Sequence, residues 1–223
     1  MNNMAIKKLT AFLVLTLPLI TACSGLLSKQ SVQIGYYSLE SSQLNAPAES
    51  QSSSNNALPT LIINTPKAAA GFDTRHMMYT RAPHKLEYFA RNEWVDTPAN
   101  MLQPLMIATI ANTGNFSAVI PKLGAVKADL RLESEVLKLV QAFDQKPSVV
   151  YFSLRAVMIN NATGKIVALR EFKEQAIAKS DDPNGGVNAA NVAVDAALKK
   201  LSAFSAETTI NWNATNSNTA ILK

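Results

Sequence analysis

Apolar and polar residues alternate along one stretch in the second half of the chain, residues 126–136. A period of two over this length is typical of a half-buried β-strand and not of a helix. The alternation changes phase after Val136, where Leu137 follows directly, so we also expect a β-bulge at this point. The apolar positions that define the strand are Val126, Ala128, Leu130, Leu132 and Val136.

Two further apolar stretches, residues 149–159 and 165–177, predict the next strands of the same sheet. They are joined by Asn160-Asn161-Ala162-Thr163-Gly164, which supplies Asn and Gly where a hairpin requires positive φ. The pattern therefore predicts a three-strand antiparallel meander over about 126–177. A shorter strand is expected at residues 32–39.

Residues 98–113 carry an apolar stripe that predicts a helix. Thr97 supplies a capping hydroxyl ahead of a proline at the first helical position, and Gly114 is a typical left-handed stop. Pro104 leaves two alternatives open, because it either kinks the helix or marks a true start at Gln103.

A second amphipathic helix is predicted at residues 187–206, with Gly185-Gly186 as a flexible entry. Asp195 and Lys199, four residues apart, pair on its polar side. Its apolar stripe consists of Val187, Ala190, Val194, Ala197, Leu198, Leu201 and Phe204. We therefore expect an α+β fold in which a mostly antiparallel sheet carries both helices on one face.

Two segments, residues 41–57 and 207–223, are poor in large apolar residues and rich in Ser, Asn and Ala. Such segments bury too little apolar surface to offset the entropy of ordering, so we expect a flexible linker and a disordered polar tail. Between them, residues 58–206 form a single predicted domain. Residues 23–40 contain the short first strand and precede the linker.

Residues 1–22 have the layout of a secretory signal peptide, with Lys7 and Lys8, a mostly apolar run, and small residues before Cys23. The apolar run is shorter than the roughly 20 residues that cross a bilayer, and Pro18 interrupts it, so export and cleavage are predicted. Without the signal, 19 basic and 16 acidic side chains remain of the original 21 and 16. No Lys/Arg cluster is present, so we expect no nucleic-acid binding.

Ile20-Thr21-Ala22-Cys23 resembles the lipobox of bacterial lipoproteins. The resemblance implies cleavage between Ala22 and Cys23, a diacylglyceryl group on the Cys23 sulfur, and a fatty acyl chain such as palmitate on the new amino group. Two or three chains hold a protein durably on a membrane. Ser24 stands where an Asp tends to retain such proteins in the inner membrane, which implies the outer membrane. The alternative is an unmodified, buried Cys23 behind an ordinary cleavage site.

Candidate chemistry is sparse. The sequence lacks a G-x-S-x-G elbow, a phosphate-binding G-x-x-x-x-G-K-[ST] loop and an H-E-x-x-H pair. His76 and His84 are the only histidines, and no cysteine or carboxylate set accompanies them at ligand spacing. Asp181-Asp182 lacks the alternating spacing of a calcium loop and predicts a polar turn before a helix. We therefore expect no catalytic residue, cofactor or metal, and a protein that is not an enzyme.

One region, residues 72–120, carries a family resemblance. It contains Met77-Met78-Tyr79-Thr80-Arg81, then LEYFARNEW from Leu86 to Trp94, then Pro98 and an apolar helix that ends in Gly114-Asn115-Phe116. These segments, in this order, resemble the ABC-type transport auxiliary lipoprotein family, which includes PqiC-like outer-membrane lipoproteins. Tyr36-Tyr37-Ser38-Leu39 and the long alternating strand are similar to that family as well.

The resemblance implies a non-catalytic lipoprotein on the outer membrane, with its domain in the periplasm. It implies an accessory subunit of an MCE-type ABC system that moves phospholipid or other hydrophobic molecules. The implied partners are a periplasmic substrate-binding protein with MCE domains, a membrane permease and an ATPase. The lipoprotein would dock the periplasmic component through an exposed sheet face or strand edge.

Tyr88, Arg91 and Trp94 are the candidate contact residues within the LEYFARNEW segment. Tyr88 and Trp94 are amphipathic aromatics that either brace the sheet against the first helix or bind a partner. We expect Arg91 and Glu93 in a turn between the strand and the helix.

Two other functions stay open. A direct periplasmic lipid carrier would need an apolar groove, which flexible methionines suit. The methionines available for such a groove are Met77, Met78, Met101, Met106 and Met158. The third function is that of an outer-membrane lipoprotein that regulates a cell-wall synthase. The transported molecule and the formation of homo-oligomers are also left open.

Overall fold

The computed structural model describes residues 33–42, 58–124 and 126–221. The signal peptide, the cleavage site at Ala22 and Cys23, the sorting residue Ser24 and most of the predicted linker lie outside the described residues. All elements below belong to one compact unit, Ile34–Lys223.

Three long strands form the predicted antiparallel meander, β7 (Leu130–Ala142), β8 (Val149–Asn160) and β9 (Ile166–Ile177). The register of β7 on β8 shifts between Val136 and Lys138, which confirms the predicted bulge. β7 begins at Leu130 and not at the predicted Val126. Just before it, the Asp129 carboxylate accepts hydrogen bonds from the Thr60 backbone N–H and hydroxyl, each at 2.8 Å, so this residue caps the start of β2 instead of extending β7. The turn after β8 contains Gly164 at φ 69°, as the hairpin pattern predicts.

The sheet has nine strands and is mixed, so the prediction of a mostly antiparallel sheet is wrong. Five pairings among the described strands are parallel and three are antiparallel. Parallel neighbours need a crossover connection, and the first helix lies in the long connection from β2 to its parallel neighbour β6, directly before β6. The remaining strands are β1 (Gly35–Tyr37), β2 (Thr60–Ile63), β3 (Lys67–Ala68), β4 (His76–Ala82), β5 (Lys85–Trp94) and β6 (Ala118–Pro121).

Helix α2 (Pro98–Ala111) has the predicted cap, since the Thr97 side chain accepts from the Asn100 N–H. Pro104 lies inside the helix, which runs through it and begins at Pro98. The alternative start at Gln103 is therefore wrong. Gly114 adopts the left-handed conformation at φ 66°, as predicted for the stop.

Helix α3 (Pro183–Ile221) is much longer than the predicted helix. The disordered tail predicted at residues 207–223 is wrong over its described part, because the helix continues to Ile221. Thr208 and Thr209 are buried, and their hydroxyls donate to backbone carbonyls one turn earlier, so these polar residues satisfy themselves inside the helix. Trp212 packs against the hydrophobic core. No helix among the described residues is long and apolar enough to cross a membrane.

The start of α3 is a tightly packed polar turn, as Asp181-Asp182 predicted. The Asp181 carboxylate accepts from the Ser148 N–H at 2.7 Å, and the Asp182 carboxylate accepts from the Gly185 N–H at 2.8 Å; these bonds lower the pKa of both carboxyls. The predicted flexible entry at Gly185-Gly186 is wrong. Both glycines are helical and buried, and a Cβ at Gly185 would collide with the backbone oxygen of Ser180.

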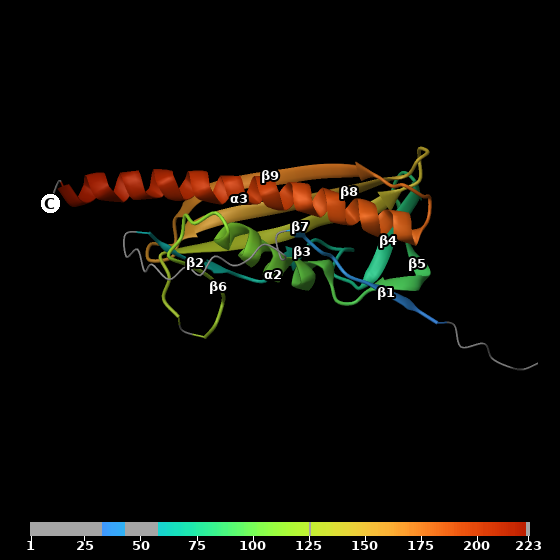
Figure 1. Ribbon diagram of the computed structural model, residues 1–223, viewed down its shortest axis with the longest axis horizontal. Helices are drawn as coiled ribbons and strands as arrows, with labels where there is room; N and C mark the ends of the chain where they lie inside the picture. Colours follow the sequence, from blue (N-terminus) through green and yellow to red (C-terminus); the bar gives the residue numbers. More distant parts are fainter. Residues whose placement is uncertain (1–32, 43–57, 125, 222–223) are drawn as a thin grey trace, which may run out of the picture. The chain divides into compact units, whose positions relative to one another are not determined.

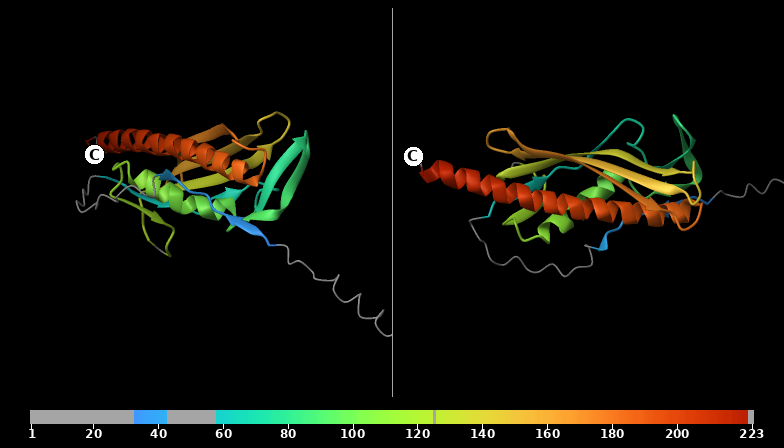
Figure 2. Two further views of the ribbon diagram at one scale, coloured as in Figure 1. Left: turned by 45° about the vertical axis from the view of Figure 1, so that its right-hand side comes forward. Right: turned by 90° about the horizontal axis from the view of Figure 1, so that it is seen from above.

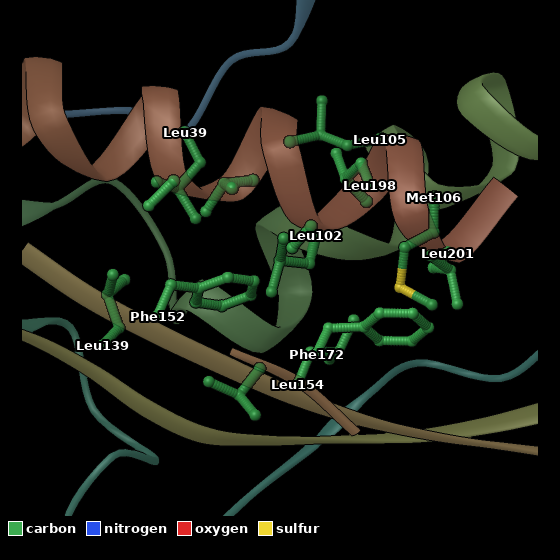
Figure 3. Packing of buried hydrophobic residues seen from close by; sticks show 14 of the residues in the cluster. Leu39, Leu102, Leu105, Met106, Leu139, Phe152, Leu154, Phe172, Leu198 and Leu201 are labelled. Atoms are coloured by element: carbon green, nitrogen blue, oxygen red, sulfur yellow. The ribbon is translucent and has the colours of Figure 1, made fainter. Parts of the chain in front are cut away.

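The core lies between the helices and one face of the sheet, as predicted (Figure 1). Both helices contribute fully buried side chains, and the predicted apolar stripe of α3 is buried along its whole length. Figure 3 shows residues of both helices meeting side chains of the meander, among them Leu102, Met106, Phe152, Phe172, Leu198 and Leu201. Phe172 of β9 and Phe204 of α3 meet edge to face, with ring centroids 6.0 Å apart.

The segment after β1 is attached to α3, so the predicted linker begins too early at residue 41. Ser41 is buried, and its hydroxyl donates to the Asp195 carboxylate at 2.8 Å. The Glu40 backbone N–H donates to the Asn191 side chain at 2.9 Å. Asp195 also pairs with Lys199 at 3.0 Å, as predicted from their spacing.

Candidate functional site

The LEYFARNEW segment is strand β5, and with β4 it forms an antiparallel hairpin. The hairpin lies at the end of the sheet where α3 begins (Figure 2). β4 joins the rest of the sheet through a short parallel pairing of Tyr79 and Thr80 with the end of β7. β5 has β1 beside it only from Asn92 to Trp94, so most of its other edge is open among the described residues. The hairpin therefore offers an open strand edge and an outer face.

The tip of the hairpin is closed by an ion pair. The Arg81 guanidinium donates to both carboxylate oxygens of Glu87, at 2.8 and 2.7 Å, and Lys85 lies 3.2 Å from the same carboxylate. These hydrogen bonds lower the pKa of Glu87 to about 2. The turn itself passes through His84 at φ 63°, a conformation that His tolerates better than β-branched residues do.

The outer face of the hairpin carries a group of aromatic and charged side chains. The His76 and Tyr88 rings stack with centroids 4.3 Å apart, and the Arg75 guanidinium lies 5.5 Å from the centre of the Tyr36 ring. Glu93 lies between the Arg75 and His76 side chains, 3.9 Å from Arg75 and 3.8 Å from His76 Nδ1. We call Tyr36, Arg75, His76, Tyr88 and Glu93 the hairpin patch.

The two tyrosines of the hairpin patch are the most exposed of its members, with Tyr36 at 55% and Tyr88 at 53%. Aromatic and arginine side chains are enriched where proteins bind one another, because they bury much area at little entropic cost. The patch can therefore act as a recognition surface.

The inner face of the hairpin packs against the body of the domain. The Tyr79 and Phe89 rings lie 4.6 Å apart, and Phe143, just after β7, completes the cluster with its ring 5.7 Å from Tyr79. Trp94 is only 4% exposed, and its backbone N–H donates to the Arg75 carbonyl at 2.8 Å. The inner face thus fixes the position of the hairpin patch.

The three candidate contact residues have different surroundings. Trp94 is a core residue at the base of the hairpin, whereas Tyr88 is exposed in the hairpin patch. Arg91 is exposed on β5. Arg91 and Glu93 lie within the strand, so their predicted place in a turn is wrong; the chain bends after Trp94, at Val95 and Asp96.

Sequence reasoning missed Tyr36, Arg75 and His76 as members of the site. Tyr36 is far from the others along the chain, and only the parallel pairing of Tyr36 with Glu93 in the β1–β5 ladder brings it there. The alternating order of His76, Met78 and Thr80 along β4 was the available signal, since it places His76 on the face opposite the buried Met77.

A small apolar cavity lies between the base of the hairpin and the start of α3. Its volume is about 20 Å³, and Met77, Met78, Phe89, Trp94 and Ala190 are among the residues that line it. This volume accommodates roughly one water molecule and no acyl chain. Met106 and Met158, two of the methionines proposed for a lipid groove, are fully buried core residues.

The described residues contain no group of three or more His, Cys, Asp or Glu side chains that could hold a metal ion. His76 has Glu93 as its only nearby carboxylate in the ion pairs of the described residues, and His84 lies at the tip of the hairpin. In the described part of the chain, the candidate functional site is therefore a surface of aromatic and charged side chains.

The architecture defines a class of α+β proteins in which a mixed sheet carries two helices on one face and a hairpin at one end. Residues 37–202 match the ABC-type transport auxiliary lipoprotein component family, and this chain belongs to that family. The match contains the hairpin, the meander, α2 and most of the core stripe of α3.

Two solved structures share the fold. Protein XCC0632 from Xanthomonas campestris is 19% identical and superposes with a TM-score of 0.63, covering 68% of this chain and 85% of its own. A crystal structure described only as an uncharacterized protein is 13% identical, with a TM-score of 0.57, and covers 78% of this chain and 97% of its own. No curated protein matches the chain in sequence.

Proposed function

We propose that this protein is a non-catalytic accessory lipoprotein of an MCE-type ABC transport system for phospholipid or other hydrophobic molecules. It is anchored in the outer membrane through Cys23 and docks the periplasmic MCE-domain component of the system. The observation that carries the proposal is the family match over residues 37–202, together with the lipobox-like Ile20-Thr21-Ala22-Cys23.

The hairpin patch is the docking surface in this proposal. It combines two exposed tyrosines with an arginine and a glutamate, so a partner meets apolar area and both signs of charge in one place. The half-buried aromatic cluster of the inner face and the Arg81–Glu87 pair hold the hairpin in shape before binding, which lowers the entropic cost of association.

Docking is supported over lipid carriage by the size of the cavity under the hairpin. A carrier needs an enclosed apolar space of several hundred Å³, as ligand sites usually have. The apolar cavity between hairpin and α3 has about 20 Å³. Two hollows of about 470 and 440 Å³ also lie on the described part of the chain, but they are open and lined mostly by polar and charged side chains, which do not suit an acyl chain.

The test is site-specific photo-crosslinking in the cell that makes the protein. A photoreactive side chain at Tyr88 is expected to capture an MCE-domain protein. The same side chain at Ala162, which is exposed in the turn at the opposite end of the meander, is the matched control and should capture none. Equal labelling from both positions, or capture of a cell-wall synthase by Tyr88, would contradict the proposal.

The anchor is tested by Cys23→Ser. We expect the full chain to be found in the membrane fraction with an N-terminal peptide heavier by the mass of its acyl chains, and the variant to lack that mass and leave the membrane fraction. Ser24→Ala is the control and should keep both properties. An unmodified Cys23 in the wild-type protein would show that the anchor proposal is wrong.

A further inference from the structure

Strand β9 is the outermost strand of the meander. It pairs with β8 along its length and with no other strand among the described residues (Figure 1). Its twelve residues present one unpaired edge, with Ile166, Leu169 and Ile177 more than half exposed. A long open edge of this kind is a template for another strand, and proteins usually cover or blunt it.

The direction of each backbone group on β9 follows from one hydrogen bond. The Ala178 N–H donates to the Ser148 carbonyl at 2.8 Å, which places residue 178 on the side of β8. Because successive residues of an antiparallel strand direct their backbone groups to opposite sides, even residues back to 168 bond β8. The open edge therefore carries the N–H and C=O groups of Leu169, Glu171, Lys173, Gln175 and Ile177.

The side chains of β9 are self-complementary about Phe172. Two antiparallel copies that cross at Phe172 place Glu171 opposite Lys173, and Arg170 opposite Glu174. Farther out, Ala168 meets Ala176 and Val167 meets Ile177. Opposite charges directly across an antiparallel ladder stabilise it, and like charges destabilise it.

We propose that the β9 edges of two copies of this chain pair antiparallel about a two-fold axis at Phe172, forming one continuous sheet. The proposal is independent of the docking function above. In this register Glu171 and Lys173 exchange both backbone hydrogen bonds across the axis, as do Leu169 and Gln175, because all four direct their backbone groups to the edge.

The neighbouring registers, with the axis through a charged residue beside Phe172, are disfavoured by charge. Residues that bond across the edge have odd numbers, so the axis must pass through a residue. An axis through Arg170, Glu171, Lys173 or Glu174 places that residue opposite its own copy, with like charges in contact. Phe172 is the position in this charged stretch that avoids it.

The charged side chains on both faces of the joined sheet, next to the two-fold axis, are also complementary between the two copies. On the open face, Glu171 lies 3.2 Å from Lys173 of its own chain and 3.9 Å from Arg155, and Arg155 also joins Glu135 at 3.0 Å. Across the two-fold axis each Glu171 also lies opposite Lys173 of the second copy, so the charges of this row alternate along both chains. On the helix face, Arg170 pairs with Glu207 and Glu174 pairs with Lys200. The joined row then reads Glu207, Arg170, Glu174, Lys200 across the two copies, with charges that alternate throughout.

The first test is the self-association of the full chain in detergent, measured by sedimentation equilibrium. We expect a dimer, and we expect Lys173→Glu to weaken dimerisation roughly tenfold to a hundredfold, since it creates two like-charge contacts per dimer. The double variant Glu171→Lys, Lys173→Glu restores opposite charges and should recover most of the association. Lys122→Glu, an exposed substitution of the same charge outside β9, should have no effect.

A backbone test separates edge pairing from charge alone. Gln175→Pro removes an N–H that points to the open edge, so it leaves the β8 ladder intact and should weaken the dimer. Amide exchange of Leu169, Glu171 and Lys173 should slow as protein concentration rises. A chain that stays monomeric at high concentration, or a dimer in which Lys173→Glu and Gln175→Pro behave like Lys122→Glu, would overturn the proposal.

Discussion

The Arg81–Glu87 pair shows how much a single contact can fix at the residue scale. Both side chains lie at the hairpin tip, far from the core, yet the guanidinium meets both oxygens of the carboxylate. Two parallel charge-assisted bonds give this contact a defined geometry, which ties the end of β4 to the start of β5 at the tip.

The pKa of Glu87 gives the first prediction. Its folded-state pKa is lowered from 4.5 to about 2, so the stabilisation from its ionised form is fully present above about 4.5 and is lost as the pH falls through about 2. We expect a carboxyl titration followed by NMR to show a midpoint near 2. Arg81→Gln should raise the midpoint towards 4.5. A midpoint near 4.5 in the wild-type protein would mean that the pair is not formed in solution.

The glycines at the start of α3 act through their lack of a Cβ, not through flexibility. Gly185 faces the Ser180 backbone, and a Cβ there has no room because a backbone atom cannot rotate away. Gly185→Ala should lower the free energy of unfolding by about 1–3 kcal/mol, the usual cost of overpacking. Asn188→Ala, exposed on the next turn, should stay within about 0.5 kcal/mol. Denaturant unfolding of both variants measures the difference.

At the scale of elements, the long periodic segments were predictable and the short ones were not. The strict alternation of residues 126–136 indicated β7 and its bulge, because one face of that part of the strand is buried and the other is more exposed to solvent. β2 and β3 have four and two residues, which is too short to show a period or a direction. Their parallel pairing with β7 is set by tertiary contacts, so the sequence favoured an antiparallel sheet.

The C-terminal part of α3 shows a limit of composition as a guide. Residues 207–214 are mostly polar, yet Thr208 and Thr209 bond their own helix and Trp212 reaches the core. A helix whose earlier turns are already packed can extend through such a polar segment. Extension adds one backbone hydrogen bond per residue and avoids the unfavourable nucleation step. The same composition in an isolated segment would favour disorder.

This extension gives a prediction for Trp212. Trp212→Ala should lower the free energy of unfolding by about 1–3 kcal/mol, because it removes apolar area packed on the core. Ile210→Ala is the matched control, since it also truncates a large apolar side chain of α3 but one that is 61% exposed, and it should have little effect. Equal stability of the two variants in urea would indicate that the end of the chain does not pack as the structure shows.

At the scale of the whole molecule, the sequence indicated the family but only part of the surface. Tyr88 was identified within the LEYFARNEW segment, whereas Tyr36 joins the hairpin patch through a parallel ladder between residues more than fifty positions apart. A pairing between residues so far apart leaves no signal in the local pattern of the sequence. Trp94, which resembles Tyr88 in chemistry, is buried because it lies at the base of the hairpin and contacts the core.

The size of the cavity leads to a prediction for the purified protein. The apolar cavity under the hairpin has about 20 Å³, and two larger hollows of about 470 and 440 Å³ are open and lined mostly by polar and charged side chains, so the protein should bind no phospholipid at stoichiometric levels beyond its own anchor. Native mass spectrometry from detergent, with Cys23→Ser as the anchor-free control, measures this directly. One bound phospholipid per chain in both proteins would favour the carrier function.

Strand β1 has a mechanical consequence that follows from the order of elements along the chain. If the protein is held by its first residues, any pull reaches the compact unit at Ile34 and meets β1 before any other element. β1 pairs with β5 at only three ladder positions among the described residues. After β1, the chain is attached to α3 by the hydrogen bond from the Ser41 hydroxyl to the Asp195 carboxylate. Tension would therefore separate β1 from β5 before it reaches α3. Tyr36 would leave the hairpin patch together with β1, so a stretched N-terminal segment would disrupt the patch and release a partner bound there.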